Sequence, residues 1–419
     1  MKKLLTLAIV ILLLFPSCAK NPLPASSLWF NAQYSCFLGS TAYISDLTRI
    51  TVYTPDGIRK GLCRDPLCAH DGSDGICPDC HSLRWPDVVT DGELLYLSAM
   101  TFDSTTGAYS RELYSLRPDG SAFKRICKTD MTGSDSPDFK VGGGYLWFTQ
   151  GQYDEDAPEG ERETYSILRV PVTGGEPEIV GDGYLFAPNF TVSADGKTLA
   201  VINASFSSRP VNAPASSEGE WIELTDVESG EKTRLDPPAA DETPVFIDTW
   251  RGEFWLRTEK DRTLSFTRDS GEAVEKRRSD WILYRLPAGE SEFVRAAEAD
   301  SGFVFGGDAV YYTRTESEYL GTKPMPTGRP GEMVDADFFE TKTVAVCFWK
   351  DGTITEITPD FPEGFENLSL TAGADGILYG SMNDGGRNYY ETGEISFVSC
   401  AFDPETVTVI RTFDPVRLD

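Results

Sequence analysis

The stretch SADGKTLAVI (193–202) combines a glycine turn with an alternating apolar strand, and variants of it recur along the chain. Asp-Gly and Gly-Gly pairs supply the positive φ angles of tight hairpin turns at little cost. The pattern returns as TDGELLYLSA (90–99), GGGYLWFTQ (142–150) and WRGEFWLRT (250–258). Alternation of this kind predicts strands with one buried face.

Each such segment continues through a polar link into a second alternating strand, a second glycine turn and a short final strand. Examples of this second half are ELYSLRPDGSAFKRIC (112–127) and WIELTDVESGEKTRL (221–235). Units of four short strands that repeat about every fifty residues are typical of a β-propeller, because one blade cannot bury both of its faces alone. The sequence therefore predicts an all-β fold, a propeller of four-stranded blades. Seven units fit the pattern best, within a range of six to eight.

The segment SADGKTLAVI resembles the repeat of TolB-like propellers, and the other units are looser variants of it. This resemblance implies the fold along nearly the whole chain. It implies no ligand or reaction, because propellers host many activities.

The chain begins with MKKLLTLAIVILLLFPSCAK (1–20), in which two lysines precede a short apolar run and a small residue precedes Cys18. That order is typical of a secretory signal, and the run is too short to cross a bilayer comfortably. The sequence FPSC (15–18) resembles a bacterial lipobox, which implies a lipid on Cys18. An ordinary signal peptide cut near Ser17 is the alternative.

These features divide the chain into a lipoprotein signal peptide (1–17), a lipidated cysteine with a tether (18–34) and a propeller (35–419). We expect the protein on the extracytoplasmic face of the cell membrane, attached through the lipid anchor only, as a monomer.

The formal net charge of −28 argues against nucleic-acid binding, which requires stripes of lysine and arginine. A cationic ligand or Ca²⁺ remains compatible with that charge. The acidic loops DGSDG (71–75) and QYDEDAPEGE (152–161) offer the oxygen ligands that Ca²⁺ prefers.

The segment LCRDPLCAHDGSDGICPDCHSLRW (62–85) is rich in metal-ligating side chains. It holds four of the nine cysteines and both histidines of the chain: Cys63, Cys68, Cys77, Cys80, His70 and His81. Three interpretations compete for this segment. A structural Zn²⁺ site would use Cys63, Cys68, His70 and Cys77, with Cys80 or His81 as alternates.

The second interpretation is disulfide bonds, which form in exported proteins. The third is a c-type haem on the C-x-x-C-H pattern from Cys77 to His81, with His70 or Met100 as the distal ligand.

The pattern from Cys63 to His70, followed by Cys77-Pro78, resembles the C-x-x-P-x-C-x-H…C-P element near the first blade of propeller lipoproteins of Gram-positive anaerobes. The resemblance implies that Cys63, Cys68, His70 and Cys77 act as one unit. Cys80 and His81 are additional to that element.

The long links of the chain are expected at one end of the blades. Because consecutive strands are antiparallel, the first–second and third–fourth turns share one end, and the second–third and interblade links share the other. Long links such as 259–279 and 316–340, together with the loop 62–85, are therefore expected at the second end. Long loops on a rigid scaffold commonly bind. We expect a protein, peptide or glycan partner there, with the cysteine loop as a structural clip.

Catalysis through histidine would have to use the loop 62–85, because the chain has no other histidine. No nucleophile elbow, P-loop or H-E-x-x-H motif is present. A carboxylate-dependent hydrolase of glycosidase type, in the propeller pore, is the alternative function, and an acidic pair near an arginine would favour it. A haem redox protein is a further alternative.

Overall fold

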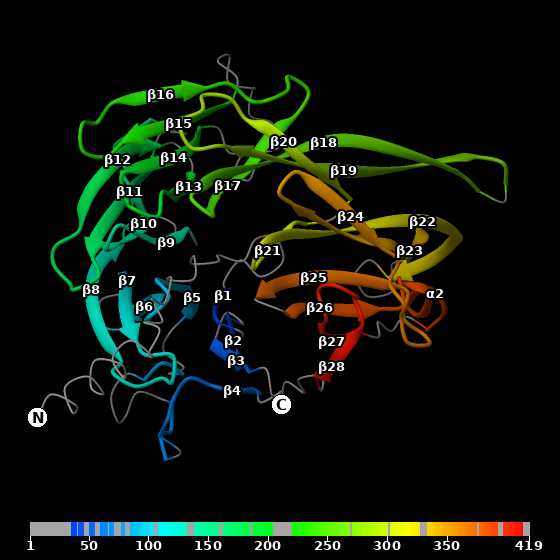
Figure 1. The fold of residues 1–419 in the computed structure, drawn as a ribbon, viewed down its shortest axis with the longest axis horizontal. Coiled ribbons are helices and arrows are strands. Elements are labelled where there is room, and N and C mark those ends of the chain that lie inside the picture. The colour runs from blue at the N-terminus through cyan, green and yellow to red at the C-terminus, as the bar shows by residue number, and fades with distance from the viewer. Residues whose placement is uncertain are drawn as a thin grey trace, which may run out of the picture.

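A computed structural model of the chain contains seven four-stranded antiparallel sheets arranged in a ring (Figure 1). The structure describes residues 35–413, apart from 204–219 and shorter gaps that include 46–49, 55–58, 71–76, 80–83, 132–137 and 327–332. The predicted seven-bladed β-propeller is confirmed.

Each blade consists of four consecutive strands, with the first strand nearest the centre of the ring. Blades one and two are β1 (Ser35–Leu38), β2 (Thr41–Ser45), β3 (Ile50–Tyr53), β4 (Arg59–Lys60), β5 (Arg84–Thr90), β6 (Leu95–Asp103), β7 (Ala108–Leu116) and β8 (Lys124–Met131). Blades three and four are β9 (Phe139–Gly142), β10 (Tyr145–Tyr153), β11 (Glu163–Pro171), β12 (Glu178–Tyr184), β13 (Asn189–Val192), β14 (Thr198–Asn203), β15 (Trp221–Asp226) and β16 (Lys232–Leu235). Blades five and six are β17 (Thr243–Trp250), β18 (Glu253–Thr267), β19 (Ala273–Leu286), β20 (Val294–Ala299), β21 (Val304–Gly306), β22 (Ala309–Pro326), β23 (Met333–Lys350) and β24 (Thr353–Ile357). Blade seven is β25 (Asn367–Ala374), β26 (Ile377–Asn383), β27 (Phe397–Phe402) and β28 (Val409–Phe413), with helix α2 (Arg387–Thr392) between β26 and β27.

The core is divided among the seams of the ring. Seven apolar clusters of described residues each join two adjacent blades, including blades seven and one. The middle strands bury both faces, which differs from the one-sided burial that we predicted. Leu95 and Leu97 pack toward blade one, whereas Tyr96 packs toward blade three, and all three are at most 1% exposed. Each blade has a neighbouring blade on both sides. Alternate side chains of a middle strand therefore pack against different neighbours, and both faces are apolar.

The turns of neighbouring blades touch at glycine. Gly196, in the turn of SADGKTLAVI, has a φ of 72°, which favours glycine. Gly143 in the blade-three turn donates its N–H to the carbonyl of Ala194 at 3.0 Å. A Cβ on either glycine would collide with the backbone of the other turn. These glycines allow blades three and four to approach at this end.

Within the described part of the chain, the ring closes without an exchanged strand, since blade one contains β1–β4 and blade seven contains β25–β28. Side chains make the seam: the rings of Phe37 and Tyr379 lie 5.6 Å apart between centroids, beside Ala42 and Ala401. This is a small cluster, so blade one depends on further contacts with blade two.

The predicted long links at 259–279 and 316–340 are not loops. They extend β18–β19 and β22–β23 into long paired hairpins on the right of Figure 1. We call these extensions, with helix α2, the hairpin lobe. The end of the blades that carries it is the long-link end, and the opposite end is the short-turn end. Among the described residues, no helix has the length and apolar character needed to cross a membrane.

Candidate metal centre and central cavity

The loop that carries the candidate metal ligands begins where β4 ends at Lys60. Leu62 is 3% exposed in the apolar cluster between blades one and two, and Cys77 packs against that cluster. The Asp79 carboxylate accepts hydrogen bonds from the backbone N–H groups of Leu62 and Cys63, at 3.1 and 2.7 Å. These contacts fasten both ends of the loop to each other and to the propeller.

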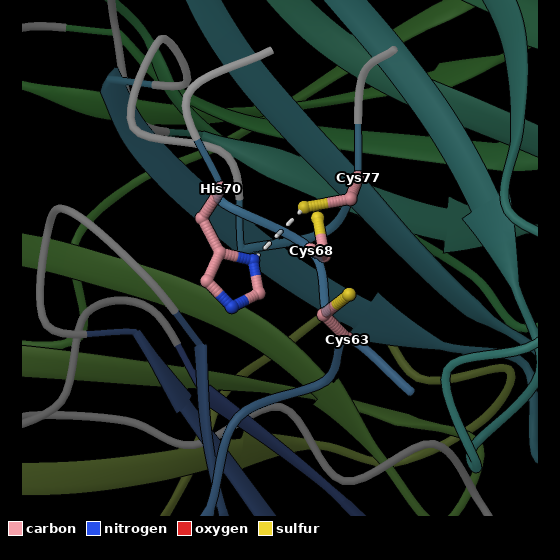
Figure 2. A group of neighbouring side chains, drawn as sticks. All are labelled: Cys63, Cys68, His70 and Cys77. Carbon is pink, nitrogen blue, oxygen red and sulfur yellow. Dashed lines mark hydrogen bonds between the residues drawn. The ribbon is translucent and has the colours of Figure 1, made fainter. Parts of the chain in front are cut away.

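Four predicted ligands converge in this loop (Figure 2). The Sγ atoms of Cys63, Cys68 and Cys77 and a ring nitrogen of His70 all lie within 4.8 Å of one another. His70 Nδ1 is 3.3 Å from Cys77 Sγ. In a tetrahedral zinc site with bonds of about 2.3 Å to sulfur and about 2.0 Å to nitrogen, ligand atoms lie about 3.5–3.8 Å apart. The group can therefore hold a metal ion such as zinc.

Local turn chemistry places these ligands. The Asp65 carboxylate accepts the N–H of Leu67 at 2.9 Å, and the Asp65 carbonyl accepts the N–H of Cys68 at 3.2 Å. This turn brings Cys68 back toward Cys63. His70 has a φ of 57°, a left-handed conformation that non-glycine residues adopt infrequently.

Cys63, Cys68 and Cys77 are free thiols in this structure. Burial raises the pKa of the Cys63 thiol and that of the Cys77 thiol. A metal binds the thiolate form, so binding at this group releases protons and strengthens as the pH rises.

The other cysteines that the structure describes lie in strands. Cys36, Cys127, Cys347 and Cys400 are buried free thiols there. Cys80, His81 and Cys18 lie outside the described residues. The haem interpretation, which requires Cys80 and His81, therefore stays a prediction. The acidic loop 71–75 also lies outside the described residues, and the described part of 152–161 forms no group of metal ligands.

The described part of the loop lies against the β7–β8 turn of blade two. Arg64 Nη1 is 3.0 Å from Asp119 Oδ2 in that turn, and a Cβ on Gly120 would collide with the Leu62 carbonyl. A third–fourth turn belongs to the short-turn end. The prediction that the loop lies with the long links is therefore wrong for these residues. The reason is the length of β4, which pairs with β3 only through Arg59 and Lys60, so that the chain leaves the blade early.

A charged group that we did not predict surrounds the centre of the ring. Lys140 Nζ in β9 is 3.4 Å from Asp248 Oδ2 in β17. The Thr191 hydroxyl in β13 donates to Asp248 Oδ1 at 3.0 Å. Lys140, Thr191 and Asp248 line a pocket among the inner strands, which we call the central cavity.

Two further carboxyl groups, those of Asp87 and Asp138, interact electrostatically with Lys140 and with Arg111. Burial raises the pKa of Asp87 to about 8 and that of Asp138 to about 6, although the positive charges of Lys140 and Arg111 oppose both shifts. Asp87 is 6% exposed and Arg111 is 2% exposed. One sequence signal could have found the two acids, since a Pro-Asp pair occurs in both WPDVV (85–89) and SPDFK (136–140), next to or within the inner strand of each blade.

We predict that protein stability falls between pH 6 and pH 8 because of Asp87. Its pKa is about 8 in the folded chain and near the ordinary 3.8 when unfolded, so the folded state binds the extra proton in this window. One such group lowers the free energy of unfolding by about 1.4 kcal/mol per pH unit. Urea denaturation at several pH values should show this slope, and Asp87→Asn should flatten it. An equal slope in wild type and variant would contradict the assignment.

The comparisons with known proteins address the fold. No family model and no curated protein sequence matches the chain. The solved structure of TolB from Acinetobacter baumannii shares 12% identity over 92% of this chain and 80% of its own, with a TM-score of 0.33. A putative TolB from Agrobacterium tumefaciens shares 16% identity over 64% of this chain and 81% of its own, with a TM-score of 0.32. The β-propeller domain of the Trilobed protease from Pyrococcus furiosus shares 13% identity over 80% of this chain and 98% of its own, with a TM-score of 0.34. The chain thus has distant structural similarity to TolB and other propellers, and these values assign no family.

Proposed function

We propose that this protein is a cell-surface lipoprotein whose propeller binds a partner protein, peptide or glycan through the hairpin lobe. The group of Cys63, Cys68, His70 and Cys77 holds a structural zinc ion, and Cys18 carries the lipid. The lipobox-like sequence and the resemblance of the cysteine element to propeller lipoproteins support the anchor.

The observation that carries the proposal is that the parts of the lobe are fastened to one another. Arg268, directly after β18, makes two hydrogen bonds to Asp337 on β23, at 3.2 and 2.7 Å. The rings of Phe266 and Phe339 lie 4.9 Å apart between the same two hairpins. Links that were only tolerated insertions would not need such cross-links.

Helix α2 is joined to the same structure. The Arg387 guanidinium donates to both oxygens of Glu340, at 2.6 and 2.8 Å, and Glu340 is fully buried. The rings of Phe338 and Tyr390 lie 5.3 Å apart. The lobe is therefore preformed across blades five, six and seven, and a preformed surface loses less conformational entropy on binding.

The tip of the lobe presents an apolar contact. Met333 and Val334, at the start of β23, are 58% and 51% exposed. Because successive strand residues point to opposite faces, each face of the hairpin exposes one apolar side chain here, and an apolar side chain on a preformed surface suits a partner contact.

The double variant Met333→Ser/Val334→Ser tests this function. All the chains compared carry Cys18→Ser, so that no lipid holds them in the membrane fraction. We expect the double variant to lose at least about tenfold in co-sedimentation with wall and membrane fractions of the producing cell, since a hot-spot contact contributes about 1.4 kcal/mol or more. The matched control is Ile354→Ser, because Ile354 is 47% exposed on β24 of the same blade but outside the lobe. Equal retention of wild type and double variant would contradict lobe binding.

The second candidate function is a carboxylate-dependent hydrolase in the pore. The raised pKa values of Asp87 and Asp138, whose carboxyl groups interact with Lys140 and Arg111, favour it, since such values suit a general acid. It ranks second because Asp87 and Arg111 are almost fully buried. Hydrolysis of aryl glycosides that disappears in Asp87→Asn and Asp248→Asn would establish it.

A further inference from the structure

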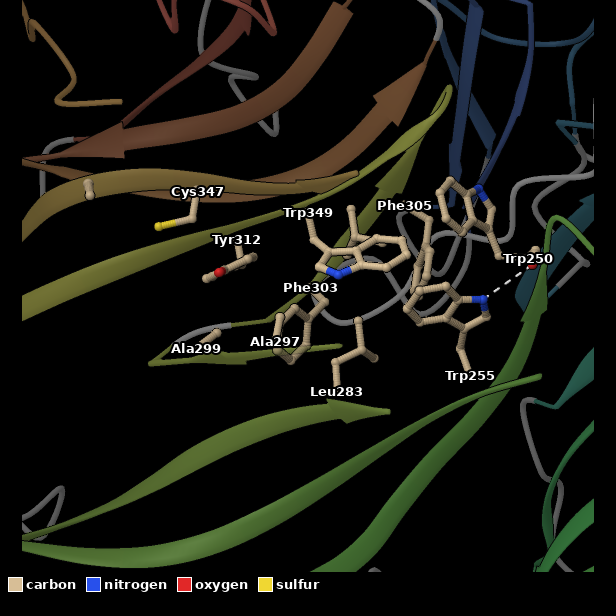
Figure 3. Close-up of a cluster of buried hydrophobic side chains, with 12 residues drawn as sticks. Trp250, Trp255, Leu283, Ala297, Ala299, Phe303, Phe305, Tyr312, Cys347 and Trp349 are labelled. Carbon is tan, nitrogen blue, oxygen red and sulfur yellow. Dashed lines mark hydrogen bonds between the residues drawn. The ribbon is translucent and has the colours of Figure 1, made fainter. Parts of the chain in front are cut away.

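A pocket of ≈ 370 Å³ lies between blades five and six, at the short-turn end. It is lined by Trp250, Trp255 and Trp349, with Arg251, Arg285 and Asp351 among the polar side chains. Figure 3 shows the three indole rings gathered beside one another. The volume falls within the range of about 300–1,000 Å³ that small-molecule sites occupy. The pocket lies at the opposite end of the blades from the hairpin lobe, so it goes beyond the proposed function.

Arg251 occupies a backbone position that does not favour arginine. It precedes Gly252 in the β17–β18 turn with a φ of 54°, in the left-handed region. Such positions prefer glycine, asparagine or aspartate. Asp351 occupies the corresponding position before Gly352 with a φ of 48°, and its residue type fits. An outlier of this kind points to a use for its side chain.

The charges of the pocket are already paired. Arg285 Nη1 lies 3.1 Å from Glu253 Oε1, and Arg251 Nη1 lies 3.7 Å from Asp351 Oδ1. The two guanidinium groups also lie over indole rings, Arg251 over Trp250 at 5.3 Å and Arg285 over Trp349 at 5.7 Å. Two cations beside two anions give no net attraction for a charged ligand.

Two donors in the pocket remain unused. Trp255 donates its indole N–H to the Trp250 carbonyl at 3.2 Å. Among the residues that the structure describes, the indole N–H groups of Trp250 and Trp349 have no acceptor, and neither nitrogen is one of the buried polar atoms that lack a partner, so both are accessible. A ligand in the pocket that they line is placed to accept from them.

We propose that this pocket binds a neutral saccharide. Sugar hydroxyls both donate, here to Glu253 and Asp351, and accept, here from the guanidinium and indole N–H groups. The apolar C–H groups of a sugar ring suit the apolar faces of indole rings. A neutral ligand also matches a pocket with balanced charge.

Isothermal titration of the purified full chain tests the proposal. The probes are neutral tetrasaccharides of glucose, mannose, xylose and N-acetylglucosamine, with tetragalacturonate as the anionic comparison. We expect saturable binding of at least one neutral probe, weakened at least tenfold by Arg251→Asn. That substitution suits the left-handed turn, so the melting temperature should stay equal or rise. The matched control is Arg234→Asn, since the Arg234 guanidinium lies over Trp221 at 4.5 Å outside the pocket and its loss should leave affinity unchanged.

A second variant tests the indole donor. Trp349→Phe keeps an aromatic ring and removes the N–H, and it should weaken binding of the same probe severalfold. The proposal is overturned if no neutral probe binds, if tetragalacturonate binds more tightly than all of them, or if Arg251→Asn binds as wild type does.

Discussion

Removal of the metal from the group of Cys63, Cys68, His70 and Cys77 should release residues 62–79 from blades one and two, while the other blades stay folded. In the described part of the loop, the residues that pack in the apolar cluster between blades one and two are Leu62 and Cys77. Structural zinc contributes about 10–16 kcal/mol in isolated zinc-finger peptides. We expect the metal to raise the free energy of local opening of this loop by several kcal/mol. Hydrogen exchange at the backbone N–H groups of Leu62 and Cys63, with and without a chelator, measures the effect.

Cys77→Ser should reproduce the exchange of the chelated protein. Its matched control is Cys400→Ser, which alters a buried thiol in β27 outside the metal group and should leave loop exchange unchanged. Slow loop exchange after complete removal of the metal would contradict the clip, because the hydrogen bonds from Asp79 would then be sufficient.

The second large effect is expected from Lys140→Met, which removes a charge from the central cavity. The Lys140 and Asp248 side chains are 13% and 4% exposed, so the variant removes a cation that lies against a buried carboxylate. Such a loss typically costs about 3–5 kcal/mol. Methionine keeps most of the aliphatic stem beside Phe246, so the loss reports mainly on charge. Urea denaturation at pH 7 measures the difference.

The double variant Lys140→Met/Asp248→Asn should recover part of this stability, because no buried charge is then left uncompensated. The surface control is Arg314→Met: Arg314 and Glu356 pair at 2.6 Å with both side chains about half exposed, and such pairs contribute at most about 1 kcal/mol. A Lys140→Met variant no less stable than Arg314→Met would contradict the importance of the central pair.

The fold could be predicted from the sequence because its signals are local. A turn such as Asp195-Gly196 and the strand that follows it are contiguous, and the repeat shows how many units must stack. The burial of both faces at Leu95 and Tyr96 depends on neighbouring blades, so alternation alone was interpreted as one buried face. The links at 259–279 and 316–340 were predicted as loops. Each in fact pairs with itself as an extension of a hairpin, which their sequences did not indicate.

The metal ligands could be predicted for the same reason, since Cys63, Cys68, His70 and Cys77 are close along the chain. Their place on the propeller could not, because it depends on the early end of β4. The central cavity and the pocket lined by Trp250, Trp255 and Trp349 bring together residues that are distant in sequence. Asp248 in blade five lies near Lys140 in blade three only because the blades are arranged in a ring. Arg251 contacts Asp351 only across the seam between blades five and six.

The measurement that tests the account most directly is the metal content of the anaerobically purified protein, by elemental analysis with a visible absorption spectrum. The account predicts one zinc ion per chain, no haem absorbance, and loss of the zinc in Cys63→Ser/His70→Ala. A metal-free protein, a haem spectrum, or zinc retained in that double variant would contradict it.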